Sequence, residues 1–479
     1  MEQFYCDGMK IRDSFGRERI FRGINICWKV PHISAEKVLE LVESEKFLNF
    51  IETTDKKLGV NIIRLGVTWA PFEEDEGKYN DELIDAFKKY IQILGEHGIY
   101  VMLDMHQDLF AHCLCKFGDG APRWAVANCK KQQRPFAVWA EGYFYMQSVQ
   151  NAFNDFWNDR NGVQTKFINM WSHLKERLSD CDNIIGYDYF NEPFIHANGR
   201  KVFLSLLENV TKIVFRKDID YEKYYDDGKE KKDFARMALK IASIIKSPAG
   251  LKKLFTVMDS KENFALAVSG LEKYTEPFNK EYYQPFFDRM SREVGCEDKF
   301  NFFEHNYYSN LGIPFEISTK ANDIYSPHAY DIFIDSPLYN KYSSNNRISF
   351  ILDAIRENQL KMNVPVLFGE WGGGAPGSDW IKHIDFIMGE FEKYHWSSIY
   401  WGYHIKNKQL ERVFNRPYPV AVCGDITKIH TDSEKRIFTL EWQCGRDFGE
   451  DVMTEVYVPE KGIVKYPAVI GDNSIIIEY

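Results

Sequence analysis

The sequence predicts an α/β protein built on a (β/α)₈ TIM barrel, followed by a small C-terminal antiparallel β-sandwich. Apolar strands alternate with amphipathic helices, as in barrel folds. No glycine-rich phosphate loop follows the first strand, which argues against a dinucleotide-binding fold. After about residue 408, short β-type runs separated by turn residues replace the helices. We therefore expect residues 1–407 to form the barrel and residues 408–479 the sandwich.

Eight apolar and aromatic stretches have the length and composition of barrel strands. In chain order they are Arg19–Trp28, Asn61–Trp69, Tyr100–Asp108, Ile184–Pro193, Phe300–His305, Asp323–Tyr330, Val364–Gly372 and Ser397–His404. The helical patterns between them are Ala35–Leu58, Asp81–His97, a region ending at Leu178, Ser343–Met362 and Asp379–Tyr394. The stretch 194–299 is too long for one crossover, so we expect a mostly helical insertion there.

The bulk composition limits the class of protein and its partners. A formal net charge of −10 argues against nucleic acid as a main partner, because phosphate binding needs a basic face. The N-terminal residues show no signal-peptide pattern and no run reaches the roughly 18 apolar residues of a membrane span, so we expect a cytoplasmic location. No feature of the sequence indicates an obligate protein partner or a cofactor.

The nine cysteines are scattered and odd in number, which fits reduced thiols better than a disulfide framework. Cys113, Cys115 and Cys129 crowd one loop and could in principle bind a metal ion. Their spacing matches no known zinc pattern, and we expect no metal site.

Polar and aromatic side chains gather at the carboxyl ends of the predicted strands, where barrel active sites lie. The set consists of Asn25, Lys29, Arg64, Trp69, His106, Asp108, Asn191, Glu192, Glu304, His305, His328, Tyr330, Glu370, Trp371, Trp401 and His404. Taken singly, each has an ordinary explanation, such as a structural histidine or a salt-bridge partner. Together they indicate an active site at one face of the barrel.

Glu192 and Glu370 end two strands of similar design and suggest a pair of carboxylates at one site. Cleavage of a glycosidic bond needs one acid to protonate the leaving oxygen and one carboxylate to attack the anomeric carbon or to activate water. Direct attack needs carboxyl groups about 5–5.5 Å apart, and the water route about 6.5–9.5 Å. Strands four and seven, facing each other across the barrel mouth, could meet the shorter distance.

With these residues the chain resembles glycoside hydrolase family 5, and within it the branch of endoglycoceramidases and related glucosylceramidases. The motifs of the general family are Arg64, Asn191-Glu192-Pro193, His328-Ala329-Tyr330, Glu370 and Trp401. The branch is indicated by FRGINICWKVP at 21–31, DMHQDLF at 104–110, GDGAPRWA at 118–125, FGEWGG at 368–373 and the C-terminal stretch that starts near RPYPVAVCGD.

The resemblance implies a retaining mechanism with Glu192 as general acid/base and Glu370 as nucleophile. Arg64 is then expected to hydrogen-bond Glu370, Tyr330 to donate to its other oxygen, and Asn191 to bind the sugar 2-hydroxyl. The pKa of Glu192 is expected to be raised by the nearby charge of Glu370. The substrate-binding residues implied are Lys29, Arg64, His106, Asp108, Trp139, Asn191, His328, Tyr330 and Trp401.

The substrate of the resembled branch is a β-glucose linked to a lipid, so a glycolipid substrate is expected, with peripheral contact to a membrane or micelle. The aromatic loop 109–145 could form an apolar slot for the lipid tail, or could simply pack on the barrel. An open sugar side would release whole oligosaccharides, the endoglycoceramidase-like action that we slightly favour. If the insertion closes that side, the enzyme would be an exo-acting β-glucosidase on glucosylceramide or a steryl glucoside. Further alternatives are a family 5 endoglucanase and a catalytically silent glycolipid-binding protein.

Overall fold

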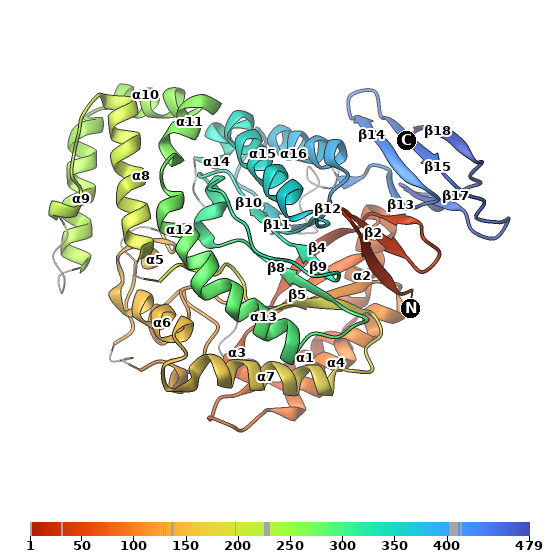
Figure 1. Cartoon of the computed structure of the whole chain (residues 1–479), viewed down its shortest axis with the longest axis horizontal. Coiled ribbons are helices and arrows are strands. Elements are labelled where there is room, and N and C mark those ends of the chain that lie inside the picture. The colour runs from red at the N-terminus through yellow and green to blue at the C-terminus, as the bar shows by residue number, and fades with distance from the viewer. Residues whose placement is uncertain are drawn as a thin grey trace.

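The structure is a computed structural model that describes residues 2–29, 32–127, 129, 131–135, 138–196, 198–224, 230–334, 336, 338–401, 411 and 414–479. Figure 1 shows a barrel in the middle, a group of helices at one end and antiparallel sheets at the other. Among the described residues, no helix has the length and apolar character that crossing a bilayer requires.

A curled sheet of parallel strands forms the centre, in the order β10-β11-β12-β4-β5-β6-β7-β8-β9. Its strands are β4 (Arg22–Cys27), β5 (Ile62–Val67), β6 (Tyr100–Met105), β7 (Ile184–Asp188), β8 (Phe300–Phe303), β9 (Asp323–Tyr325), β10 (His328–Ala329), β11 (Leu367–Gly372) and β12 (Ser397–Trp401). The predicted strand 323–330 is interrupted at Ser326-Pro327, where proline offers no N–H to the ladder. Its first half pairs with β8 and its second half with β11. A bridge between Tyr325 and Val366 closes the ring, which makes an eight-stranded (β/α)₈ barrel as predicted.

Amphipathic helices cover the outside of the barrel. They are α1 (Ala35–Val42), α2 (Glu45–Leu58), α3 (Trp69–Phe72), α4 (Asp81–Glu96), α5 (Glu141–Tyr145), α6 (Gln147–Trp157), α7 (Val163–Arg177), α14 (Tyr339–Tyr342), α15 (Asn345–Met362) and α16 (Trp380–Tyr394). The single helix predicted over 35–58 is wrong, because Ser44 interrupts it. Its hydroxyl accepts the N–H of Phe47 at 3.2 Å and donates to Leu41 at 2.6 Å, which ends one helix and starts the next.

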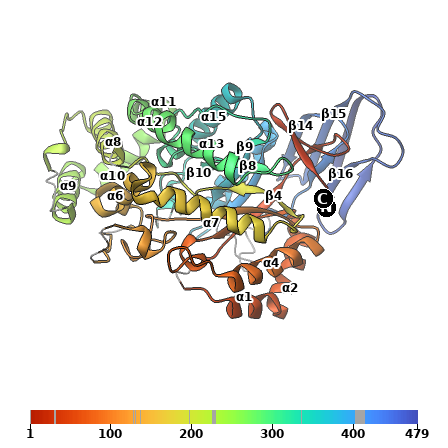
Figure 2. The ribbon, with the colours of Figure 1, turned by 60° about the horizontal axis from the view of Figure 1, so that its bottom comes forward.

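The stretch 194–299 is helical in its described part. It contains α8 (Asn198–Phe215), α9 (Glu230–Ile245), α10 (Pro248–Met258), α11 (Lys261–Val268), α12 (Glu272–Phe278), a π-helical turn at Asn279–Tyr283 and α13 (Gln284–Glu293). Helix α13 returns to the barrel and buries Phe286, Phe287 and Met290. In both views α8, α9 and α10 lie at the end of the molecule opposite the C-terminal sheets (Figures 1 and 2).

Two antiparallel sheets form the C-terminal part, and the first residues of the chain join one of them. The six-stranded sheet contains β1 (Phe4–Asp7), β2 (Lys10–Asp13), β3 (Glu18–Arg19), β13 (Tyr418–Val422), β16 (Thr454–Val458) and β17 (Gly462–Tyr466). The three-stranded sheet contains β14 (Asp425–Asp432), β15 (Ile437–Cys444) and β18 (Gly471–Glu478). Val422, Ile426, Phe438 and Val456 belong to the core shared by the two sheets.

The division expected at residue 407 falls within 402–410, outside the described residues, as does His404, and it stays a prediction. The pairing of β3 with β13 nevertheless places the first strands with the C-terminal sheet rather than with the barrel. Phe4, Cys6 and Ile11 also cover the amino ends of the barrel strands, in one cluster with Phe21, Ile62 and Ile399. The hairpin β1–β2 therefore closes the bottom of the barrel, and the mouth lies at the other end.

Candidate active site

The side chains of Glu192 and Glu370 meet at the carboxyl end of the barrel. One carboxylate oxygen of each lies within 4.8 Å of the other and of a ring nitrogen of His328. Glu370 lies in β11 at an irregularity between Phe368 and Trp371, and its Cα pairs with that of His328 in β10. The backbone approaches closely here, since a Cβ on Gly369 would lie 2.8 Å from Ser326 Oγ. The nearest carboxylate oxygens are thus closer together than the roughly 6.5–9.5 Å by which the water route separates the two carboxyl groups.

Arg64 is the centre of the charged network below this pair. Its guanidinium is completely buried and donates to Glu370 Oε1 at 2.7 Å, Glu304 Oε1 at 2.9 Å and Asp188 Oδ2 at 2.9 Å. The expected hydrogen bond to Glu370 is confirmed. Nη2 also donates to Asn191 Oδ1 at 2.9 Å, so this cation on β5 orients residues that lie on β7 and β11 or shortly after β7 and β8.

Glu370 is held in its charged form. Tyr330 donates its hydroxyl to Oε2 at 2.8 Å, as expected, while Arg64 occupies Oε1. Burial alone would raise the pKa of Glu370, but the positive charges of His328 and Arg64 outweigh burial and lower it. This carboxylate is therefore ionised at neutral pH.

Glu192 has the opposite electrostatics. Burial raises the pKa of Glu192, the negative charge of Glu370 adds to the effect, and the hydrogen bond from His328 opposes it. The predicted direction is confirmed, but burial, not Glu370, is the largest cause. The two carboxyl groups thus have pKa values shifted in opposite directions, the pattern of an acid and a base sharing one site.

The backbone at Glu192 is unusual and firmly held. Its φ of 45° is in the left-handed region, which a non-glycine residue adopts only when its surroundings require it. Its N–H donates to Glu304 Oε2 at 2.7 Å, and Gln107 Nε2 donates to the carbonyl of Asn191 at 2.8 Å. The charges of His328 and Arg64, working against burial, lower the pKa of Glu304 to about 2. Strand β7 ends at Asp188, five residues before the predicted end.

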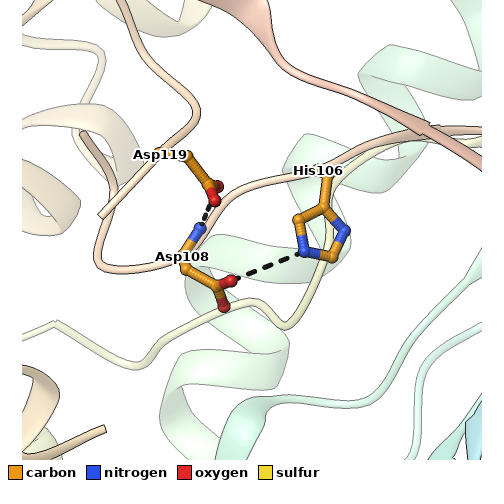
Figure 3. Close-up of side chains that lie close together, drawn as sticks. All are labelled: His106, Asp108 and Asp119. Atoms are coloured by element: carbon orange, nitrogen blue, oxygen red, sulfur yellow. Dashed lines mark hydrogen bonds and ion pairs between the residues drawn. The ribbon is translucent and has the colours of Figure 1, made fainter. Parts of the chain in front are cut away.

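A second polar cluster lies beside the pair. Lys29 Nζ donates to Asp108 Oδ2 at 2.5 Å and lies 4.6 Å from the centre of the Trp401 ring. His106 is stacked on Trp401 at 5.7 Å and its Nδ1 is 2.8 Å from Asp104 Oδ2. Figure 3 shows His106 and Asp119 on either side of Asp108, whose N–H donates to Asp119 Oδ1 at 2.8 Å. The residues predicted to bind sugar after β4, after β6 and at the end of β12 are therefore gathered together.

Within the part of the chain that the structure describes, three groups of acidic and histidine side chains have spacings that could hold a metal ion. They are His106 with Asp108 and Asp119, Glu192 with His328 and Glu370, and Asp104 with Asp188 and Glu304. In the first group Lys29 already neutralises Asp108, and in the third Arg64 reaches all three carboxylates within 3.1 Å. Protein cations thus occupy the places that a metal ion would take in these two groups.

Trp139 lies further along the loop after β6, where its ring meets Tyr143 at 6.1 Å. The Tyr143 hydroxyl accepts the N–H of Leu109 at 3.0 Å, so Trp139 is linked to the site through packing. Of the loop aromatics, Phe110, Tyr143 and Tyr145 are buried, and others pack against neighbouring rings: Phe144 on Phe203 and Trp124 on Trp69. Phe117 is 54% exposed, and Phe136 lies outside the described residues. Most of these rings pack the loop against neighbouring helices, including α8 and α9 of the insertion.

Sequence reasoning missed four polar residues that position the glutamates. Asp104 lies on β6, Asp188 lies on β7, and Gln107 lies in the turn after β6. Asn310 follows β8, in the 3-10 turn Tyr307–Leu311. The signal available for the first two was an acidic residue inside an otherwise apolar barrel strand, which is costly unless it is paired. Asn310 gave no such signal, because it lies in a turn where asparagine is common. All nine cysteines are free thiols, as expected.

Comparisons with known proteins identify the family. The model for cellulase (glycosyl hydrolase family 5) matches residues 21–407, and that for the glycoside hydrolase family 5 C-terminal domain matches residues 416–471. An endoglycoceramidase of Cyanea nozakii is 28% identical over 204 residues, which cover 38% of this chain and 40% of that protein. A glucosylceramidase of Rhizopus delemar is 26% identical over 239 residues, covering 39% of this chain and 35% of that protein. The chain thus spans about two fifths or less of the length of these curated relatives.

Solved structures resemble the whole chain. Endo-glycoceramidase II from Rhodococcus sp. superposes with a TM-score of 0.66 at 20% identity, covering 97% of this chain and 98% of that one. Sterylglucosidase 1 of Cryptococcus neoformans superposes with a TM-score of 0.69 at 14% identity, covering 99% and 96%. At these identities the likeness establishes the fold. The family models, which between them span the barrel and the C-terminal sheets, show that this chain belongs to glycoside hydrolase family 5.

Proposed function

We propose that this protein is a retaining β-glycosidase that cleaves the bond between glucose, or a glucose-terminated oligosaccharide, and a lipid. The observation that carries the proposal is the pair Glu192 and Glu370, with oxygens within 4.8 Å and pKa values shifted in opposite directions. A neutral acid beside a charged carboxylate at this separation suits double displacement.

In the first step a Glu370 carboxylate oxygen attacks the anomeric carbon, and the bond from that carbon to the leaving oxygen breaks. The proton of Glu192 passes to the leaving oxygen, so the lipid departs as a neutral alcohol. In the second step Glu192 takes a proton from water, which displaces Glu370 and releases the sugar with its original anomeric configuration. Arg64 and Tyr330 keep Glu370 aimed by holding both of its oxygens.

The neighbouring residues have proposed roles in holding the sugar. Asn191 donates one N–H of its amide to Gln107 at 3.1 Å, and its second N–H is available for the 2-hydroxyl. His328, facing both glutamates, contributes positive charge between them. Lys29, His106 and Asp108 are proposed to bind hydroxyls, with Trp401 as the stacking platform; Trp139 is proposed to contact the substrate at the loop side.

The lipid part of the proposal rests on the relatives. Those aligned with this chain are named endoglycoceramidase and glucosylceramidase, and one solved structure of endo-glycoceramidase II from Rhodococcus sp. is a complex with ganglioside GM3. We favour endoglycoceramidase-like action. The alternative is exo-action on glucosylceramide or steryl glucoside. The structural likeness to a sterylglucosidase supports this alternative.

The first test is hydrolysis of an activated aryl β-glucoside by wild type, Glu370→Gln and Glu192→Gln. Loss of the nucleophile should lower kcat by at least about 10⁴-fold. Loss of the acid should cost about 10²–10⁴-fold on a lipid substrate and less on the aryl glucoside, whose leaving group needs little protonation. A matched control is Glu73→Gln, another buried glutamate, which accepts hydrogen bonds from Trp69 and Gly77. Full activity in Glu370→Gln would refute the proposed nucleophile, and an inactive wild type would favour the silent binder.

The second test compares two purified lipids, glucosylceramide and a lactosyl- or ganglioside-type glycosphingolipid. Intact oligosaccharide released from the larger lipid supports endo-action and an open sugar side. Glucose from the small lipid alone identifies an exo-acting glucosidase. If neither lipid is cleaved while the aryl glucoside is, the sphingolipid assignment is wrong, and hydrolysis of a soluble β-glucan would then identify an endoglucanase.

A further inference from the structure

The two oxygens of Glu192 have different surroundings. Oε1 faces two nitrogens, Asn310 Nδ2 at 3.0 Å and His328 Nδ1 at 3.1 Å. No hydrogen bond to Oε2 is found among the described residues. Because a carboxyl oxygen has two lone pairs, two N–H donors leave Oε1 with no site for a proton.

The His328 ring lies between carboxylates on both of its nitrogen sides. Nε2 lies 3.2 Å from Glu304 Oε1, and Nδ1 lies 3.6 Å from Glu370 Oε2 as well as facing Glu192. Burial would lower the pKa of His328, but the charges of Glu304 and Glu370 raise it well above the ordinary value. An imidazolium carries N–H on both nitrogens, so Nδ1 donates to Glu192.

Asn310 is oriented by a chain of hydrogen bonds that starts in the barrel. Its Oδ1 lies 2.6 Å from His305 Nε2, and His305 Nδ1 lies 2.7 Å from the Tyr325 hydroxyl. Burial lowers the pKa of His305 to about 4, so the ring is neutral and has one N–H. An amide oxygen can only accept, which assigns that N–H to Nε2 and makes Tyr325 the donor to Nδ1. Every donor in the chain therefore points toward Glu192.

The turn that contains Asn310 is fixed by the insertion. Asn306 begins it by accepting the N–H of Tyr308 at 3.1 Å, and its amide donates to Asn279 Oδ1 at 3.0 Å. The hydroxyl of Tyr308 donates to the carbonyl of Gly199 at the start of α8. The large insertion thus supports the turn that reaches the catalytic carboxyl group.

We propose that Asn310 is a positioning residue for Glu192, which occupies Oε1 and so makes Oε2 the oxygen that carries the acid proton. The inference rests on the proposed function, because it assigns a proton path to that reaction. Oε2 gives its proton to the leaving oxygen in the first step, and the same atom takes a proton from water in the second. Asn310 and His328 stabilise the carboxylate present between the two steps.

The test is the pH profile of kcat/KM for Asn310→Ala and Asn310→Asp on the aryl glucoside and on a glycoside with a poor leaving group. Removing an N–H donor from a carboxylate raises its pKa. The basic limb, set by Glu192, should move up by about one pH unit in Asn310→Ala. It should move further in Asn310→Asp, where a negative charge replaces a donor. The acidic limb, set by Glu370, should stay in place.

Asn345→Ala is the control, because Asn345 Oδ1 pairs with His383 Nδ1 at 2.8 Å in another asparagine–histidine pair, in which the histidine is buried and the asparagine is exposed, on α15 and α16. It should leave both limbs unchanged. His305→Leu should move the basic limb in the same direction as Asn310→Ala but by less, since the amide remains while its orientation is lost. Identical pH profiles in wild type, Asn310→Ala and His305→Leu would overturn the inference.

Failure of this inference and of the proposed function can be told apart. An active wild type with unmoved variants refutes the role of Asn310 alone, whereas a wild type inactive on every glucoside refutes the proposed function. The titration of Glu192 can then be followed without substrate, by NMR of ¹³C-labelled glutamate carboxyl groups with Glu192→Gln to assign the signal. Should Asn310→Ala not fold, His305→Leu and Asn310→Asp provide the same comparison.

Discussion

Four carboxylates share the guanidinium of Arg64, and this arrangement explains how so many acids are buried at one site. Asp104, Asp188, Glu304 and Glu370 all lie within 3.1 Å of its nitrogens. A buried cation of this kind is tolerated because each N–H has an acceptor. Arg64 on β5 thus binds carboxylates on β6, β7 and β11 and one directly after β8. Through Glu304, which accepts the N–H of Glu192, the residue that aims the proposed nucleophile also holds the backbone at Glu192.

Asp119 provides a pH dependence of stability at the residue scale. Burial raises the pKa of Asp119 to about 7, and the charge of Asp108 adds to this, while His106 and Lys29 oppose it. Unfolded aspartate titrates near pH 3.9. Between about pH 4 and 7, Asp119 is therefore protonated in the folded protein and ionised in the unfolded chain. The free energy of unfolding consequently falls as the pH rises through this range.

Asp119→Asn should flatten that dependence, because asparagine keeps the oxygen that accepts the N–H of Asp108 but does not ionise. Urea unfolding at a series of pH values should show a smaller fall in the free energy of unfolding between pH 4 and 7. At pH 8 the variant should be more stable than wild type, by at most roughly 4 kcal/mol. The exposed Asp451→Asn serves as control. Equal slopes in wild type and Asp119→Asn would contradict the assignment.

At the scale of elements, the hairpin β1–β2 is part of the barrel core as well as of the C-terminal sheet. Phe4 meets Phe21 at 5.2 Å and Tyr100 at 5.0 Å, edge to face, across the amino ends of the barrel strands. Its neighbour Tyr5 points the other way and is 43% exposed. The strand alternation thus offers a natural comparison between an inward and an outward aromatic residue.

Phe4→Ala should lower the free energy of unfolding by about 2 kcal/mol, because it removes apolar area that closes the barrel. Tyr5→Ala, one position along the same strand, should change it by less than about 0.5 kcal/mol. Chemical denaturation monitored by circular dichroism measures both. If the two variants lose equal stability, the hairpin does not close the barrel in the way described.

The strands also show which elements the pattern of apolar residues in the sequence could predict and which it could not. The strands around Arg64, Glu192 and Glu370 were recognisable as apolar runs, because barrel strands are buried on both faces. Strands β1 and β17 were not, since four or five alternating residues look like any surface turn region. The sixth barrel strand was predicted as continuous, although Pro327 divides it. The sequence does not show this division, because the pairing of each half depends on strands that are distant in sequence.

At the scale of the whole molecule, charge is unevenly distributed. Between residues 230 and 261, eight lysine and arginine residues outnumber three acidic ones in a chain of net charge −10. Leu239 and Leu266 in the same helical group are 70% and 60% exposed. These helices lie on the side away from the C-terminal sheets (Figure 2). An excess of positive charge together with exposed leucines suits contact with an anionic membrane, and we propose such a contact for these helices if the substrate is the glycolipid proposed above.

We expect a fourfold charge reversal in this region to weaken binding to vesicles containing phosphatidylserine by at least about tenfold at low salt. The residues to change to glutamate are Lys232, Lys240, Lys246 and Lys252. The control reverses four lysines of the C-terminal sheets: Lys428, Lys435, Lys461 and Lys465. Co-sedimentation at two salt concentrations measures both sets, and wild type should bind poorly to purely zwitterionic vesicles. Equal losses in the two sets would place the contact elsewhere.

By itself, the sequence determined the barrel and the family, and it indicated the two glutamates that we propose as catalytic, because strand-end motifs such as Asn191-Glu192-Pro193 are local patterns. The hydrogen bonds of Arg64 and Tyr330 to Glu370 followed from the same motifs. Only the tertiary structure decided that burial is the main cause of the raised pKa of Glu192, that Asn310 reaches it, and that the first strands join the last ones. Burial, hydrogen-bond partners and sheet pairing all depend on which distant segments meet, and local patterns in a sequence do not specify that.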